Sequence, residues 1–370
     1  MNQNVSHNIG VLIPQSNAYP LMGKEFMQGL RLGLGETQYK LCIESIAFGA
    51  DPSQLMNAAQ KLIFQEDVSL TTGLLGHHGL SELVEYISKN DEILLVASMG
   101  ATQPIKLPEG TFENSLGLYD SLRDLVYYLS QNDYNKIESS TCYYESGYGL
   151  IHALADAVEN STNIEFSGHF ITPHEPRDNE AEVMQNYISE DKPDAIVAFH
   201  NGIFAKEHAT FLHENKIHEK YPIYALPFSC EDNLIAEFPD VFQEIKPISS
   251  WFLELENESN KDFIAAYEAL KGNKPSYFSL LGYENGLVIA NALKKDLPLK
   301  TAIANSNATG PRGPIVFDEE SKSTTFNHYL WKIKDGLKEK LTKLEVHPLK
   351  TPRQLEKADP KGWFNAYLCH

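Results

Sequence analysis

The fold of this chain is decided by two neighbouring stretches, Ile9-Gly-Val-Leu-Ile-Pro14 and Met22-Gly-Lys-Glu-Phe-Met-Gln-Gly-Leu-Arg-Leu-Gly-Leu34. The first is a short apolar run, typical of a strand buried on both faces of a parallel sheet, and its proline ends the strand because proline cannot donate to the ladder. In the second, apolar residues recur every four positions, which predicts a helix, with Gly29 and Gly33 where its apolar face could press close to a sheet. The two stretches therefore predict a β-turn-α unit.

The polar turn inside this unit, residues 16–24, contains Tyr19. In open parallel sheets ligands bind beyond the carboxyl ends of the strands, near helix N-termini whose free N–H groups attract anions. The turn is therefore the first candidate wall of a binding cleft, although an ordinary βα unit without a ligand role explains the same residues.

Strand and helix patterns continue to alternate along the chain with short connections. Apolar runs with strand character follow at residues 41–48, 68–76, 92–98, 141–144, 164–171, 194–199 and 221–226, with helical patterns between them. A closing third adds helices at 261–271 and 283–294, a turn and strand at 309–318, and a strand at 325–334 followed by the hairpin signal Asp335-Gly336. The alternation predicts two doubly wound α/β halves.

Length, charge and hydropathy restrict the class of protein. At 370 residues the chain exceeds one typical core, so we expect two domains. The formal net charge of −19 speaks against a nucleic-acid partner, because counterion release needs a basic surface. No run reaches the roughly 18 apolar residues of a membrane span. Residues 1–8 lack the features of a signal peptide, so we expect a cytosolic protein or a mature sequence whose signal has been removed.

Catalytic and metal-binding motifs are missing from the sequence. His213 and His218 have one residue too many between them for an HExxH zinc helix, and no nucleophile elbow, P-loop or dinucleotide fingerprint is present. The cysteines are widely spaced, which favours buried free thiols; they are Cys42, Cys142, Cys230 and Cys369. We therefore expect no enzyme activity, no cofactor and no metal site.

Four segments carry a resemblance to a known family. Residues 9–34 resemble the pattern IGVLxPxSGxxxxxGxxxxxGxxLA, and Ser98-Met-Gly-Ala-Thr-Gln-Pro104 resembles SPxATxP. Tyr144-Glu-Ser-Gly-Tyr148-Gly149 is similar to DxxYGxG, and Thr309-Gly-Pro-Arg-Gly-Pro-Ile-Val-Phe-Asp318 is similar to xGPxGxxxFD. In this order and spacing they resemble the type I periplasmic binding proteins, specifically the leucine/isoleucine/valine-binding branch of the ABC-transporter receptors.

The resemblance implies an α/β fold of two Rossmann-like lobes joined by three hinge crossings, with the ligand cleft between them. Lobe 1 would contain residues 1–118 and 251–328, and lobe 2 residues 119–250 and 329–370, with crossings near 117–120, 248–252 and 326–332. A ligand that bridges both lobes would shift the protein toward a closed state.

The resemblance also implies ligand contacts. In the first lobe it assigns them to Ser98, Ala101 and Thr102, since a turn at a strand end offers convergent N–H donors to an anion. In the second lobe Tyr148 matches the family's ligand-covering tyrosine, and a turn tyrosine packed on its own helix is the alternative. Further aromatic candidates by position are Tyr19, Phe204 and Tyr283.

Two departures from the family pattern bear on the ligand. His77 and His78 stand where the family has a serine, and they could contact a carboxylate, change the ligand class or be structural. Phe228 or Ser229 stands where amino-acid-binding members place an acidic residue for the ammonium group. The next carboxylates in the sequence are Glu231 and Asp232.

We therefore expect a monomeric, non-enzymatic, extracytoplasmic receptor that closes on an amino acid or a related carboxylate or amide and delivers it to a membrane ABC permease. Its location, periplasmic or as an outward-facing lipoprotein, is implied by the resemblance alone. A ligand-sensing regulator of the same fold is the alternative, and a receptor ectodomain is a third possibility, although the disulfide framework expected there is missing.

Overall fold

Strands and helices alternate along most of the chain. The structure is a computed structural model that describes residues 7–370 except 77–79, 105, 147, 162, 176 and 348–366, and only the backbone of Glu145 and Ser146. The first part contains β1 (His7–Ile13), α1 (Met22–Leu34), β2 (Tyr39–Ser45), α2 (Pro52–Phe64), β3 (Leu70–Leu74), α3 (Leu80–Lys89), β4 (Leu94–Ser98) and β5 (Thr111–Ser115). The middle part contains α4 (Leu118–Ser130), β6 (Lys136–Cys142), α5 (Tyr143–Ser146), α6 (Leu150–Glu159), β7 (Glu165–Thr172), α7 (Glu180–Asp191), β8 (Ala195–Phe199), α8 (Gly202–Asn215), β9 (Ile223–Ala225), α9 (Asp232–Glu237), α10 (Pro239–Phe242) and β10 (Ile245–Ser249), with 3₁₀ turns at Ile217–Glu219 and Pro227–Ser229. The last part contains α11 (Glu258–Lys271), α12 (Tyr277–Leu293), α13 (Leu299–Ala304), β11 (Thr309–Gly310), β12 (Gly313–Pro314), β13 (Tyr329–Lys334) and β14 (Leu337–Lys343).

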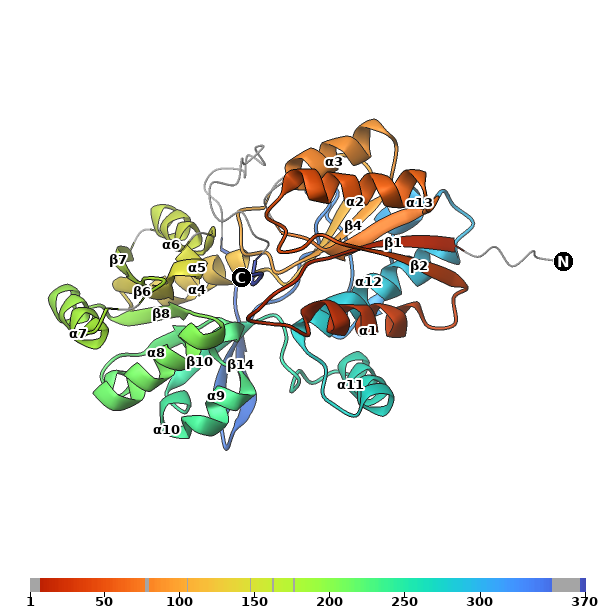
Figure 1. Cartoon of the computed structure of the whole chain (residues 1–370). Coiled ribbons are helices and arrows are strands. Elements are labelled where there is room, and N and C mark those ends of the chain that lie inside the picture. The colour runs from red at the N-terminus through yellow and green to blue at the C-terminus, as the bar shows by residue number, and fades with distance from the viewer. Residues whose placement is uncertain are drawn as a thin grey trace.

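The first lobe is built on a parallel five-stranded sheet with the order β2-β1-β3-β4-β5. β3 and β4 are buried along their whole length, as expected for strands with helices on both faces. One face packs against α2 and α3, and the other against α1 and α12 (Figure 1).

The contact between α1 and α12 is a backbone-to-backbone approach that depends on glycine. A Cβ atom at Gly29 would lie 1.9 Å from the carbonyl oxygen of Ser279, and one at Gly33 would lie 2.1 Å from that of Tyr283. The prediction that these glycines press against a sheet was therefore wrong, because a second helix lies on this face of α1.

The second lobe is built on a seven-stranded sheet with the order β14-β13-β10-β9-β8-β6-β7. The strands from β10 to β7 are parallel, and β13 and β14 add to them antiparallel. The hairpin predicted at Asp335-Gly336 is confirmed: Lys334 pairs with Leu337, and the two turn residues have φ values of 52° and 78°, as a type I′ turn requires.

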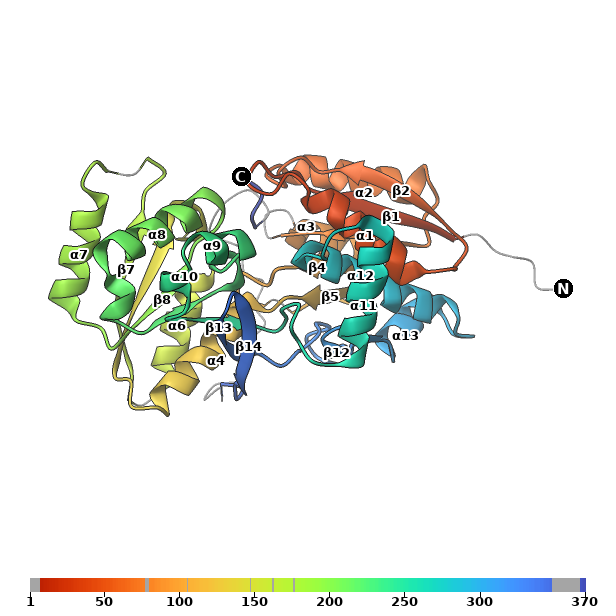
Figure 2. The same ribbon diagram turned by 90° about the horizontal axis from the view of Figure 1, so that it is seen from below.

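The chain passes between the sheets three times, which confirms the two-lobed fold (Figures 1 and 2). The passages are residues 116–117 after β5, 250–257 after β10, and 325–328 before β13. α4 packs against α6 and β10 in the second lobe, whereas α11, α12 and α13 return to the first.

Arg312 holds the three passages together. Its buried guanidinium pairs with Glu284 of α12 at 2.5 Å. It also donates to the carbonyl oxygen of Ser115 at 2.7 Å and to Ser250 Oγ at 3.3 Å, and it lies 3.7 Å from the ring centroid of Phe326. One cation thus touches the last residue before the first passage and a residue in each of the other two, which fixes the region where the lobes join.

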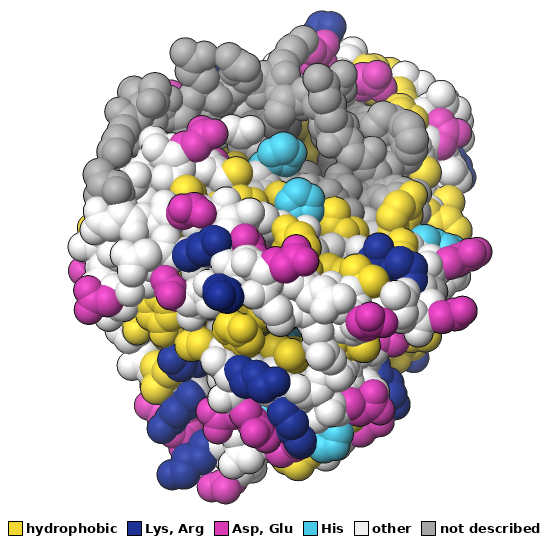
Figure 3. All heavy atoms as spheres, turned by 90° about the vertical axis from the view of Figure 1, so that its left-hand side faces the viewer, with side chains coloured by type: hydrophobic (Ala, Val, Ile, Leu, Met, Phe, Trp, Pro, Cys, Tyr) yellow, Lys and Arg dark blue, Asp and Glu magenta, His cyan; other side chains and the backbone are white. Residues whose placement is uncertain are grey.

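The surface carries charges of both signs. On the end face of the second lobe, Lys and Arg side chains are interspersed with Asp and Glu, and no continuous basic area is visible there (Figure 3). Within the described residues, no helix has both the length and the apolar character needed to cross a membrane.

Candidate ligand-binding cleft

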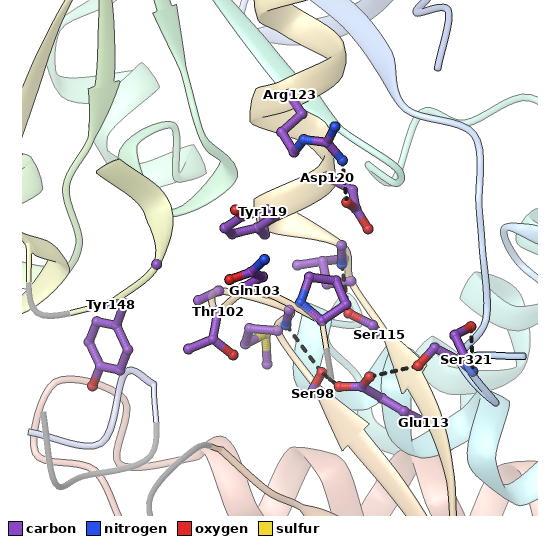
Figure 4. A pocket seen from close by; sticks show the side chains of 18 of the residues that line it. Ser98, Thr102, Gln103, Glu113, Ser115, Tyr119, Asp120, Arg123, Tyr148 and Ser321 are labelled. Atoms are coloured by element: carbon purple, nitrogen blue, oxygen red, sulfur yellow. Dashed lines mark hydrogen bonds and ion pairs between the residues drawn. The ribbon is translucent and has the colours of Figure 1, made fainter. Parts of the chain in front are cut away.

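A cavity of about 720 Å³ lies between the lobes beside the chain passages (Figure 4). The loop after β4, residues 98–104, forms its wall in the first lobe. Tyr148 and the first turns of α4 and α6 form its wall in the second lobe, and Phe326 of the third passage also lines it. We call this cavity the hinge end of the cleft.

Ser98 organises the first-lobe wall rather than presenting a free hydroxyl. Its Oγ donates to Glu113 Oε1 at 2.6 Å and accepts from the N–H of Gly100 at 3.2 Å. Ser323 donates to the other oxygen of the same carboxyl group at 3.0 Å. Burial raises the pKa of Glu113, against the effect of the two serine hydrogen bonds. Ser98, Glu113 and Ser323 therefore form one hydrogen-bonded unit behind this wall.

The two lobes touch directly at this wall. The N–H of Gly149, at the start of α6, donates to the carbonyl oxygen of Ala101 at 3.0 Å. A Cβ atom at Gly149 would lie 3.0 Å from the Cα of Thr102, so a side chain there would force the lobes apart. These contacts show that the lobes are closed on one another.

Charged groups at the hinge end are paired. Arg123 Nε lies 2.7 Å from Asp156 Oδ2, and Asp124 accepts from His328 Nδ1 at 2.7 Å and from the N–H of His347 at 2.8 Å. Burial and the nearby Arg123 lower the pKa of His347. These charged groups of the lining therefore already have partners within the protein.

Beside the hinge end, aromatic rings from both lobes pack against one another. We call this region the aromatic end and define it by the rings of Tyr19, Tyr144, Tyr148, Phe204, Phe228 and Phe278. Tyr19 contacts Phe228 and Phe278 with ring centroids 5.7 Å and 5.6 Å apart, which joins a first-lobe loop to a second-lobe loop. Tyr144 and Phe204 meet at 5.8 Å on the second-lobe side.

Residues 367–370, which we call the tail segment, lie in the aromatic end, and Figures 1 and 2 show this end of the chain between the lobes. The ring of Tyr367 packs edge-on against Tyr148 at 4.8 Å, and His370 stacks on Tyr144 at 3.9 Å. The tail segment shares one buried apolar cluster with Met22, Phe228 and Tyr148.

Tyr19 links the lobes through its hydroxyl group. The oxygen accepts from the N–H of Gly202 at 3.2 Å, and the hydroxyl is hydrogen-bonded to the Glu231 carboxylate. Burial raises the pKa of Glu231 to about 7, while the hydrogen bond from Tyr19 acts in the opposite direction. Glu231 thus brings a carboxylate to the aromatic end. It follows shortly after Phe228 and Ser229, which stand where amino-acid-binding members of the family place an acidic residue.

The structure brings most of the candidate residues to the cleft. Ser98, Ala101, Thr102 and Tyr148 line the hinge end, and Tyr148 also borders the aromatic end together with Tyr19, Phe204 and Phe228. Ser229 supports the wall from behind, because its Oγ accepts from the N–H of His200 at 2.7 Å and donates to the carbonyl oxygen of that residue at 3.0 Å. His77 and His78 lie outside the described residues.

Tyr283 requires a correction, since it does not lie in the cleft. It stacks on Phe263 of α11 at 4.5 Å, in the helical layer beside α1. α12 is buried on nearly all sides, so its sequence did not reveal which face turns toward which neighbour.

Sequence reasoning missed Tyr144, Arg123 and the tail segment. Residues 141–144 were predicted as a strand, but β6 ends at Cys142 and α5 begins, because contacts with Phe204 and His370 outweigh local β propensity at Tyr144. Arg123 lies on a correctly predicted helix, next to Asp124, and no pattern in the sequence marks it as a residue of the cleft.

His213 and His218 have structural partners. His213 Nδ1 lies 2.7 Å from Asp240 Oδ2, and His218 Nδ1 lies 2.9 Å from the carbonyl oxygen of Leu212. In the part of the chain that the structure describes, no three His, Cys, Asp or Glu side chains gather as a metal site. The four cysteines are buried thiols, as predicted.

Comparisons with known proteins agree with this geometry. The chain superposes on an ABC transporter substrate-binding protein from Sphaerobacter thermophilus with a TM-score of 0.80, over 93% of this chain and 99% of the other, at 19% identity. For a solute-binding protein of an ABC transporter from R. palustris in complex with benzoate the TM-score is 0.74, with 20% identity over 92% and 96% of the two chains. For the branched-chain amino acid transporter substrate-binding protein LivJ from Streptococcus pneumoniae in complex with isoleucine it is 0.70, with 18% identity over 93% and 100%.

These likenesses show the fold. A search of curated proteins gives no match. The family model described as periplasmic binding protein matches residues 6–338, which is most of the sequence. The chain therefore belongs to the periplasmic binding protein family.

Proposed function

We propose that the protein is a solute-binding receptor that closes on a small organic ligand and delivers it to an ABC permease. The observation that carries this proposal is a cleft between two lobes that are joined by three chain passages, with lobe-to-lobe contacts at Ala101 and Tyr19. Such a cleft gives a ligand contacts in the closed state that it lacks in the open one, which is the requirement for ligand-driven closure. Family membership supports a location outside the cytoplasmic membrane, the permease partner and action as a monomer.

The chemistry of the aromatic end favours a small carboxylate with a ring or a branched apolar group. The N–H groups of Asn17 and Ala18 both donate to the backbone oxygen of His370, at 2.9 Å and 3.1 Å. Two convergent N–H donors of this kind are what a carboxylate site requires. The surrounding rings match an apolar or planar body. Among the similar structures, one binds benzoate, another 3,4-dihydroxybenzoic acid and another isoleucine. If the ligand is an amino acid, Glu231 is the group that would pair with its ammonium.

A thermal-shift screen of the full chain tests the proposal, after unfolding and refolding to remove any bound solute. The panel would contain benzoate, 4-hydroxybenzoate, L-isoleucine, L-leucine and acetamide. A ligand at 100 times its Kd stabilises the native state by about 2.7 kcal/mol, which is several degrees in a melt.

We expect Tyr148→Ala to abolish the shift, because it removes a ring from both parts of the cleft. Phe64→Ala is the matched control, because Phe64 is an aromatic residue on α2 that is 70% exposed. A shift that survives Tyr148→Ala would place the ligand elsewhere. If no compound of the panel binds, this ligand class is contradicted and a sensor for another compound is favoured.

A further inference from the structure

The tail segment occupies the region where the solute is proposed to bind. We propose that residues 367–370 are an intramolecular ligand of the cleft, so that a solute binds only when this segment leaves. The inference rests on the proposed function, because it assumes that the aromatic end is the solute site.

The tail segment is held as a ligand would be held. Tyr367, Leu368 and Cys369 are at most 6% exposed. The carbonyl oxygen of Leu368 accepts from Ser16 Oγ at 2.5 Å, and the backbone oxygen of His370 accepts from the N–H groups of Asn17 and Ala18. These donors belong to the turn after β1, which the sequence marks as the first wall of the cleft.

The same segment also contacts the second lobe. Tyr367 contacts Tyr148 at 4.8 Å and Phe228 at 6.3 Å, and His370 stacks on Tyr144 with an angle of 9° between the ring planes. Because the tail segment binds residues of both lobes, it favours the closed arrangement over an open one, as a solute does.

The backbone of Leu368 shows that the cleft shapes the segment. Its φ of 67° lies in the left-handed region, which is disfavoured for a bulky residue. Such conformations persist where the surroundings over-determine them. A segment lying on a surface without specific contacts would relax.

The chemistry of the tail segment indicates what can replace it. A competing solute would present a carboxylate or carbonyl oxygen to residues 17 and 18 and a ring or branched apolar group to the Tyr148 side. A small aromatic acid, or a short peptide with an aromatic or leucine residue, meets both conditions.

Competition within one molecule lowers the apparent affinity of the solute. A tethered ligand acts at an effective concentration of the order of millimolar. Suppose that a free peptide with the sequence of the tail segment binds the cleft with a Kd of about 10 μM. The tethered segment then occupies the cleft about 100 times more often than it leaves it empty, and the apparent affinity for the solute falls by about 100-fold.

Four proteins test the proposal: the full chain, a chain ending at residue 366, Leu368→Asp and the control Leu297→Asp. Leu368 has no exposed surface, so an aspartate there should expel the segment while the chain keeps its length. Leu297 is 50% exposed, so the same change there should be harmless. Circular dichroism and melting curves verify that each variant folds.

The probes are the acetylated peptide Tyr-Leu-Cys-His in reducing buffer and the solute panel, measured by calorimetry. We expect the shortened chain and Leu368→Asp to bind one peptide each and to bind a panel solute about 10- to 100-fold more tightly than the full chain. The full chain and Leu297→Asp should bind no peptide at the same concentration.

The outcomes separate the two proposals. If the peptide does not bind the shortened chain and all four proteins bind a solute equally well, the intramolecular-ligand proposal is overturned and the receptor function stands. If the peptide binds the shortened chain but no solute binds any of the proteins, the tail segment is a ligand of the cleft and the proposed solute class is overturned.

Discussion

Glu138 is a buried carboxyl group in β6, and within the described residues neither of its oxygens has a hydrogen-bond partner. Burial, with a smaller effect of Asp191, raises its pKa from 4.5 to about 8. The folded protein thus keeps a proton that the unfolded chain releases, and the free energy of unfolding falls as the pH rises from about 4.5 through about 8. Each pH unit in that window lowers this free energy by about 1.4 kcal/mol.

We expect Glu138→Gln to remove this pH dependence. At pH 5 the variant should match the native protein, and at pH 8 it should be more stable by about 2–4 kcal/mol. Urea unfolding at pH 5, 6.5 and 8 measures the difference. Glu214→Gln, at an exposed position, is the control and should keep the native slope. Parallel slopes for all three proteins would show that Glu138 does not titrate in this range.

Tyr19→Phe tests the hydroxyl that links the lobes. The variant keeps the ring contacts with Phe228 and Phe278 but loses the hydrogen bonds to Gly202 and Glu231. We expect about 5- to 10-fold weaker solute binding, equivalent to about 1 kcal/mol.

The same change should raise the pKa of Glu231 above its present value of about 7, because the hydrogen bond that lowers it is gone. Calorimetric titrations at pH 6 and pH 8 would show both effects. Tyr39→Phe on β2 is the control. Unchanged affinity at both pH values would mean that the Tyr19 hydroxyl does not contribute to closure.

Among the elements, α1 and α12 form the closest contact in the first lobe. We expect Gly33→Ala to destabilise the protein by about 3 kcal/mol, because the new methyl group would meet the backbone of α12 and the helices would have to separate. Gly35→Ala should cost only about 1 kcal/mol, since it has open space and only its φ of 58° opposes a side chain. Chemical denaturation compares the two, and equal losses would show that α12 can move away from α1 at little cost.

The helices and strands could largely be predicted from the sequence, whereas the elements that pack against each of them could be predicted only in part. The run before Pro14 and the apolar strand ending at Ser98 identified β1 and β4, because buried parallel strands are continuous apolar segments. Periodicity shows which face of α1 is buried but not what covers it, so the glycine contact with α12 was missed. Of the residues chosen by positional matching, Tyr148 lies at the cavity, whereas Tyr283 lies on α12, which is buried on almost every side.

The tail segment could not have been placed from the sequence. It is a short aromatic and apolar group that follows a charged, proline-containing stretch, and four residues carry no helix or strand period. Its position depends on contacts with residues about 350 positions earlier, such as the hydrogen bond from Ser16 to Leu368. Only the folded cleft identifies its partners.

At the scale of the whole molecule, the cysteine in the tail segment should report whether this segment lies in the cleft or has left it. Cys369 has no exposed surface, and burial raises the pKa of its thiol to about 12. A thiolate is the reactive form, and a released thiol would regain a pKa of about 8.5. At pH 8 its reaction with a disulfide reagent should therefore be at least about 100-fold slower in the closed chain than after release.

We expect a saturating panel solute to accelerate the labelling of one thiol in the full chain, and Cys369→Ser to remove that fast phase. The other three cysteines are buried and provide an internal baseline. A labelling rate that does not respond to a bound solute would show that the solute and the tail segment occupy the cleft together.

The contact between α1 and α12 also has a consequence for biosynthesis. The hydrogen bond from Ser276 to Glu25 beside it joins residues 251 positions apart, whereas the parallel strands of the second sheet lie within residues 136–249. During translation, the face of α1 that carries Gly29 and Gly33 therefore remains exposed until α12 is synthesised, which happens only after the parallel strands of the second lobe. The lobe that emerges first therefore gains α12 only after the parallel core of the other lobe has been made, and during translation its exposed helix face is the surface that a chaperone would have to protect.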